Sequence, residues 1–171
     1  MMKRMSVNDI RIDKAKLLQE VIAQVEEGLR RLGSGYAVAR QATLDSPHVM
    51  KSKREVTGIE ASYLANALAG NIQEREFWLR TLRGLRLPDA PERAALGCVV
   101  GIGPPDGPAE RLYFILPVCG GMEIPVKDDA RTVRVITPET PVAKAFLGKS
   151  LGEEVSLRND QDRPDSVRLL A

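Results

Sequence analysis

The prolines of this chain are confined almost entirely to its second half. Of the 11 prolines among 171 residues, only Pro47 precedes residue 88. Proline lacks a backbone N–H donor and clashes with the preceding turn of a helix, so helices tolerate it only near their ends. The first half can therefore form long helices and the second half cannot. This predicts a chain of two parts, with domains at residues 9–87 and 92–171.

Apolar residues in the first part repeat at the heptad spacing of a helix. The first seam advances in steps of three and four residues and consists of Ala15, Leu18, Ile22, Val25, Leu29 and Leu32. Charged residues lie off this seam, so the helix needs one apolar partner. The rhythm continues to Thr43, but Gly33 and Gly35 each cost about 1 kcal/mol relative to alanine in a helix. A bend or a frayed turn is expected at these glycines.

The chain is expected to reverse direction between Asp45 and Ser52. Asp45 or Ser46 offers a capping side chain before Pro47, and Ser52 with Glu55 fits the capping box. A second seam follows, interrupted only by Arg75, and consists of Ala61, Ala65, Leu68, Ile72, Leu79 and Leu82. Two antiparallel helices of about 30 residues would form a hairpin roughly 45 Å long. Such a hairpin serves either as a scaffold or dimerisation element, or as a projection with a functional tip.

From residue 92 onwards, short apolar runs alternate with glycine and proline, which is typical of strands and turns. The expected strands are residues 96–102, 111–116, 132–136, 154–157 and 166–170. One segment favours a short helix instead, with Thr140 as its cap, Pro141 at its first position and Gly148 at its end. The residues expected to face the sheet are Val142, Ala145 and Phe146. The predicted fold class is α+β, with one short helix lying across an antiparallel sheet.

Composition excludes several classes of protein. Hydrophobic residues make up 43% of the chain and charged residues 28%, which is incompatible with a fully disordered polypeptide. No apolar run approaches the roughly 18 residues needed for a membrane span. The basic start of the chain leads into polar residues, so no secretory signal is expected. We expect a cytoplasmic protein in which Cys98 and Cys119 are reduced.

Residues that support enzymatic chemistry are scarce. His48 is the only histidine, and its neighbours do not suggest a catalytic triad. The glycines around Gly101 do not form a nucleotide-binding fingerprint. Lys51, Lys53 and Arg54 adjoin the expected hairpin tip, but three cations are a weak footprint for a phosphate backbone. We expect a protein that is not itself an enzyme and has no small-molecule substrate.

One segment resembles a known family. Residues 136–149, with the sequence ITPETPVAKAFLGK, and the following Gly152-Glu153-Glu154-Val155 resemble the C-terminal signature of the bacterial Gre transcript cleavage factors (GreA and GreB). The family pattern is roughly I-S-x-x-S-P-[ILM]-[AG]-[RK]-A-L-[IL]-G-K, followed by a Glu-Val strand start. The likeness is close over residues 136–155 and looser over residues 94–158. It implies an N-terminal antiparallel coiled coil and a C-terminal domain similar to FK506-binding proteins (FKBP-like).

The resemblance implies a transcription elongation factor whose partner is bacterial RNA polymerase. In the family, the C-terminal domain docks at the rim of the secondary channel and the coiled coil enters the channel towards the active centre. Nucleic acid, including DNA, is then met only within the transcription complex, and no membrane is involved. Glu139, Thr140 and Pro141 match the family's docking loop, with Thr in place of Ser, and are the expected polymerase contacts.

The hairpin tip departs from the family pattern. Family members carry tip acids that help hold a second Mg²⁺ shared with the polymerase active centre, so no cofactor is bound stably by the factor alone. Such chemistry needs carboxylate ligands. The family motif, approximately G-D-x-x-E-N-A-E-Y, is matched only in part by residues 58–63. The candidate tip acids are Asp45 and Glu55, with Asp45 as the candidate metal ligand, and cations surround Glu55. The resemblance supports polymerase binding more strongly than stimulation of cleavage.

Three alternatives stay open. The chain could compete with cleavage factors for the polymerase, or it could be a non-catalytic Gre-related interaction module whose hairpin dimerises. A peptidyl-prolyl isomerase is a third, weaker alternative because such sites are rich in aromatic residues. The aromatic residues of the second half are only Tyr113, Phe114 and Phe146.

Overall fold

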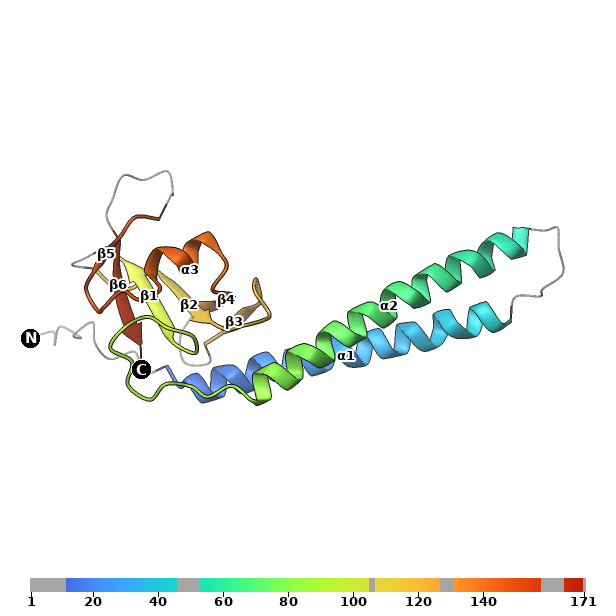
Figure 1. Cartoon of the computed structure of the whole chain (residues 1–171), viewed down its shortest axis with the longest axis horizontal. Helices are drawn as coiled ribbons and strands as arrows, with labels where there is room; N and C mark the ends of the chain where they lie inside the picture. The colour runs from blue at the N-terminus through green and yellow to red at the C-terminus, as the bar shows by residue number, and fades with distance from the viewer. Residues whose placement is uncertain (1–11, 46–52, 105–106, 127–130, 158–164, 171) are drawn as a thin grey trace, which may run out of the picture. The chain divides into compact units, whose positions relative to one another are not determined.

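The computed structural model describes residues 12–45, 53–104, 107–126, 131–157 and 165–170 (Figure 1). Two long helices come first, followed by a sheet and one short helix. In chain order the elements are α1 (Lys14–Leu44), α2 (Lys53–Arg83), β1 (Val99–Gly103), β2 (Arg111–Ile115), β3 (Glu123–Pro125), β4 (Thr132–Ile136), α3 (Pro141–Phe146), β5 (Glu154–Val155) and β6 (Asp165–Leu170). The predicted α+β class, a helical hairpin followed by a sheet with one short helix, is confirmed. No described helix has a long enough apolar stretch to cross a lipid bilayer.

The chain divides into two compact units. The hairpin unit comprises Ile22–Arg80, and the sheet unit comprises Met1–Val21 together with Thr81–Ala171. This division is spatial and assigns the ends of both long helices to the sheet unit. The expected domain bounds, 9–87 and 92–171, stay a prediction.

Two glycines of α1 set the register of the hairpin unit. A Cβ atom on Gly28 would lie 2.8 Å from Nη1 of Arg75, and one on Gly35 would lie 3.6 Å from Cδ1 of Leu68. The two contacts are one heptad apart on both helices and run in opposite directions, so the helices are antiparallel. Each helix contains 31 residues. Buried side chains line the contact, namely Val25, Ala39, Ala65 and Leu79.

Gly28 makes room for the one charged residue of the α2 seam. Because glycine has no side chain, the guanidinium group of Arg75 lies against the backbone of α1 at this point. The central guanidinium carbon of Arg75 is also 5.1 Å from the centroid of the Trp78 ring, which is within cation–π range. The interruption in the heptad pattern is therefore accommodated within the hairpin.

The expected frayed turn at Gly33 and Gly35 is wrong, because α1 is continuous from Lys14 to Leu44. Gly35 packs against Leu68, and tertiary packing of this kind outweighs the helix propensity of single residues. The predicted seam is also wrong at the start of α1. Ala15 is exposed there, whereas Leu17 and Val21 are buried. This part of α1 belongs to the sheet unit, so its buried face is set by other neighbours than α2 alone.

The sheet has six strands in the order β3-β4-β2-β1-β6-β5. Four pairings are antiparallel, but β2 and β4 are parallel, so the expectation of a purely antiparallel sheet is wrong in this detail. The reason is β3, which was not expected. After β2 the chain runs back as the edge strand β3, and β4 then returns between β3 and β2 in the direction of β2.

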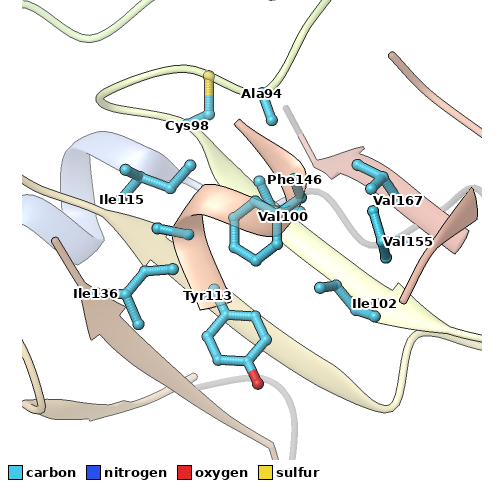
Figure 2. Packing of buried hydrophobic residues seen from close by; sticks show 11 residues of the cluster. Ala94, Cys98, Val100, Ile102, Tyr113, Ile115, Ile136, Phe146, Val155 and Val167 are labelled. Atoms are coloured by element: carbon cyan, nitrogen blue, oxygen red, sulfur yellow. The ribbon is translucent and has the colours of Figure 1, made fainter. Parts of the chain in front are cut away.

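One apolar core lies between α3 and the sheet (Figure 2). The cluster consists of Ala94, Cys98, Val100, Ile102, Tyr113, Ile115, Ile136, Ala143, Phe146, Val155 and Val167. The rings of Tyr113 and Phe146 are 5.8 Å apart between centroids and inclined by 34°. Phe146 faces the sheet as predicted, but Ala143 rather than Ala145 is the fully buried alanine of α3.

The other face of the central strands is buried as well. Its side chains alternate with those that face α3 and belong to Val99, Leu112, Phe114, Val133 and Val135. Strands buried on both faces read as continuous apolar runs, as in residues 112–116. The same unit also buries Ile12, Leu17, Val21 and Leu82. The sheet is therefore a central layer that holds its edges and loops in fixed positions.

Candidate functional site

The segment between β4 and α3 is a tightly bonded turn. The carbonyl oxygen of Thr137 accepts hydrogen bonds from the backbone N–H of Thr140 at 3.0 Å and from its hydroxyl at 2.8 Å. The hydroxyl oxygen of Thr140 in turn accepts from the N–H of Ala143 at 3.3 Å. Thr140 is therefore the N-cap of α3, and Pro141 occupies the first turn, where its missing N–H leaves no donor unpaired.

The end of α3 is held equally firmly. Gly148 has a φ of +80°, a conformation that favours glycine, and follows the C-cap Leu147. Its N–H donates to the carbonyl oxygen of Ala94 at 2.8 Å, and the N–H of Ala94 donates to the carbonyl oxygen of Lys149 at 2.8 Å. The predicted glycine at the helix end is confirmed. Both ends of α3 are thus tied to the sheet unit by backbone hydrogen bonds.

The three predicted docking residues lie together on this turn but differ in exposure. The Glu139 side chain is 89% exposed, and its Oε2 atom is 3.5 Å from Nζ of Lys144. Pro141 is exposed, whereas Thr140 is half-buried and its hydroxyl is occupied by the cap. A rigid turn thus presents Glu139 and Pro141 outwards, with Lys144 beside them. The sequence pattern contains Lys144, but its pairing with Glu139 was not anticipated.

A second capping arrangement follows α3. The Glu153 carboxylate accepts a hydrogen bond from the N–H of Ser150, and its Oε1 atom is 3.4 Å from Nζ of Lys149. The hydrogen bond from the Ser150 N–H, with a smaller contribution from Lys149, lowers the pKa of Glu153 below its ordinary value of 4.5. This carboxylate fixes the turn between α3 and β5.

We expect the stability of the chain to fall in acid partly through Glu153. Its pKa is lower in the folded state, so its contribution is present above the unfolded pKa and is lost as the pH falls through the folded pKa. Thermal unfolding of the wild type and of Glu153→Gln, measured from about pH 7 to about pH 3, checks this. The wild type should be the more stable protein at neutral pH, and the difference should disappear in acid. A difference that is independent of pH would contradict the assignment.

The hairpin tip lies partly outside the described residues. Asp45 follows the last residue of α1, and its Oδ1 atom accepts a hydrogen bond from Nε2 of Gln41 at 2.8 Å. Glu55 lies in the first turns of α2, but its side chain, like those of Lys53 and Arg54, is outside the described part. His48 and Lys51 lie outside the described residues altogether. Asp45 as a metal ligand and Glu55 as its companion therefore stay predictions.

The described residues at the tip do not fit a Mg²⁺ site. Mg²⁺ requires octahedral oxygen ligands, and Asp45 supplies one carboxylate that already accepts a hydrogen bond from Gln41. Within the described ranges, no group of three or more His, Cys, Asp or Glu side chains could hold a metal ion. Among the described residues, the candidate site is therefore the turn at residues 137–141, which leads into α3.

Comparison with known proteins finds similarity only among solved structures. No protein-family model and no curated protein matches the chain. The transcription factor Gfh1 is 22% identical, with 90% of this chain and 91% of that chain covered and a TM-score of 0.34. The GreA factor homolog 1 (Gfh1) protein of Thermus thermophilus is 18% identical, with 91% and 92% covered and a TM-score of 0.31. Gfh1 of Thermus aquaticus is 20% identical, with 92% of each chain covered and a TM-score of 0.30. At this level of similarity, function has to be inferred from the residues of this chain itself.

Proposed function

We propose that this chain is a Gre-like transcription elongation regulator that binds bacterial RNA polymerase in the cytoplasm. The sheet unit docks at the rim of the secondary channel through the turn before α3. The hairpin is the element presented to the channel. In this role the chain acts on the polymerase and is not itself an enzyme.

The observation that carries this proposal is the structure of residues 137–149. Three positions of the segment that resembles the family pattern have definite structural roles: Thr140 caps α3, Pro141 begins it, and Gly148 ends it. The exposed carboxylate of Glu139 and the ring of Pro141 are available to a partner on a rigid support.

Stimulation of transcript cleavage is not part of the proposal. Of the two candidate tip acids, only the Asp45 side chain belongs to the part of the chain that the structure describes, and a lone carboxylate is a poor ligand set for Mg²⁺. A regulator that occupies the secondary channel without delivering carboxylates would compete with cleavage factors for the same place.

Binding of the purified chain to core RNA polymerase tests the proposal. We expect the wild type to bind, and Glu139→Lys to weaken the binding by about tenfold, equivalent to about 1.4 kcal/mol. The substitution reverses the charge of an exposed side chain and places it beside Lys144 without touching the cap of α3. Affinity is measured by titration of labelled polymerase with each variant.

Glu110→Lys is the matched control, because Glu110 is also exposed, lies in the same unit and undergoes the same charge change. It should bind as the wild type does. Equal weakening by both variants would show that net charge, and not the α3 turn, governs the interaction. Failure of the wild type to bind would refute the proposed function.

A further inference from the structure

The outward face of α2 carries a second stripe of residues at heptad spacing. The stripe advances in steps of four and three and consists of Ile59, Tyr63, Asn66, Gly70, Gln73 and Phe77. All six residues are exposed, including the three large ones, at 53% for Ile59, 73% for Tyr63 and 54% for Phe77. None is charged, and residues 61–73 contain no charged residue. We call these six residues the outer stripe.

The outer stripe points away from α1. Leu68 contacts Gly35 of α1, and successive residues of a helix are rotated by about 100°, so Gly70 lies roughly 200° from Leu68. A Cβ atom added to Gly70 would meet nothing within 4 Å, which places this position in open space. The hairpin thus has one seam between its helices and another on its outside.

The outer stripe is symmetric about its own midpoint, which falls at Leu68. Ile59 and Phe77 are equally distant from this residue, as are Tyr63 and Gln73, and likewise Asn66 and Gly70. Consider two α2 helices that run antiparallel across a two-fold axis at the midpoint. Ile59 then meets Phe77 of the second copy, and Tyr63 meets Gln73, whose amide can hydrogen-bond to the phenol. Asn66 meets Gly70 near the axis, where the absence of a side chain permits close approach. Self-complementarity of this kind is what an isologous interface requires.

We propose that the chain forms a two-fold dimer in which the outer stripes of two antiparallel α2 helices pack together. The occupant of this face is a second copy because each residue of the stripe meets a complementary residue of the same stripe across the two-fold axis. A partner of unrelated sequence would not require such symmetry. This dimer is proposed independently of the polymerase-binding function. It bears on that function because dimer formation covers a face of the hairpin that is exposed in the monomer.

The surroundings of the outer stripe determine the strength of the dimer. A single pair of helices buries less than the roughly 1,600 Å² of a standard stable complex, so a micromolar dissociation constant is expected. Glu60 and Glu74 flank one edge of the stripe, and the two-fold axis brings Glu60 near Glu74 of the second copy. Salt screens repulsion between like charges, so the dimer should strengthen as ionic strength rises.

Sedimentation velocity of the full chain, from about 1 µM to about 1 mM, tests the proposal. The wild type should shift from monomer to dimer with increasing concentration, and the shift should move to lower concentration in high salt. Gly70→Glu should remain monomeric throughout, because it places a carboxylate on each copy close to the axis. Since Glu is the better helix former and the site has open space, this variant should keep or raise the melting temperature of the monomer.

Gly33→Glu is the matched control. A Cβ atom on Gly33 also meets nothing within 4 Å, and Gly33 lies on α1, away from the outer stripe. This variant should dimerise as the wild type does. A wild type that stays monomeric up to about 1 mM would overturn the proposal. Dimerisation that Gly70→Glu leaves intact would place the interface elsewhere and would overturn it equally.

Discussion

Phe146→Ala is expected to unfold the sheet unit under conditions in which the wild type is folded. The Phe146 side chain is fully buried between α3 and the strands, with the ring of Tyr113 beside it. Truncation of a buried phenylalanine costs about 3–5 kcal/mol through lost burial and the cavity left behind. This is a large fraction of the roughly 5–15 kcal/mol by which domains are stable. The turn that presents Glu139 follows β4 and opens α3, so polymerase binding should be lost together with the fold.

Urea denaturation measures this effect, and different spectroscopic signals report on the hairpin unit and on the sheet unit. Its single tryptophan, Trp78, lies in α2 and reports on the hairpin unit. Amide resonances of the strands, followed by NMR, report on the sheet unit. The matched control is Leu151→Ala, because Leu151 is 64% exposed, lies in the same unit and leaves no closed cavity when truncated. The assignment of Phe146 to the core would be wrong if the two variants had equal midpoints.

Val25→Asp is expected to have a comparably large effect on the hairpin unit. The Val25 side chain is fully buried in the contact between α1 and α2. Burial of an unpaired carboxylate costs at least about 3 kcal/mol, and the group escapes this cost only by protonation or by separation of the helices. We expect loss of most of the helical signal at 222 nm at neutral pH and a red shift of the Trp78 emission.

Ala23→Asp serves as the control for Val25→Asp. It introduces the same charge two residues earlier on α1, at an exposed position, so only the small cost of helix propensity applies. Partial recovery of the Val25→Asp helix in acid would agree with protonation of the buried carboxylate. Retention of full helicity by this variant at neutral pH would show that Val25 is not in the seam.

The parts of the fold that sequence alone could predict are those governed by local rules. The confinement of proline to the second half predicts the long helices, and Thr140, Pro141 and Gly148 predict the ends of α3 because each acts on its own backbone. The two helical seams could be predicted wherever a helix has one partner, as at Val25 and Leu79. These predictions need no knowledge of distant contacts.

The parts that sequence could not predict depend on contacts between distant segments. The start of α1 buries Leu17 and Val21 because it belongs to the sheet unit, which heptad spacing does not reveal. The strand β3 has only three residues, one of which is proline, so both it and the parallel pairing of β2 with β4 were missed. The outer stripe was missed because its glycine and amides weaken the apolar signal.

The candidate site residues also divide into those that local rules predict and those that depend on distant contacts. The turn before α3 could be predicted because it is a contiguous motif, and Glu139, Thr140 and Pro141 lie together for that reason. The pairing of Glu139 with Lys144 depends on the turn geometry of α3. The tip acids Asp45 and Glu55 belong to different helices, so sequence could name them without showing whether they converge.

The position of β6 in the sheet has a consequence for biosynthesis. This strand, from the last residues that the structure describes, lies between β1 and β5, and its Leu170 pairs with Val99. During translation, β1 therefore lacks its partner strand β6 until about seventy further residues have been synthesised. The hairpin needs no residue beyond Arg83 to form its helices and can assemble first. A nascent chain thus passes through a stage in which both long helices have emerged while β1 of the sheet unit still lacks one neighbouring strand.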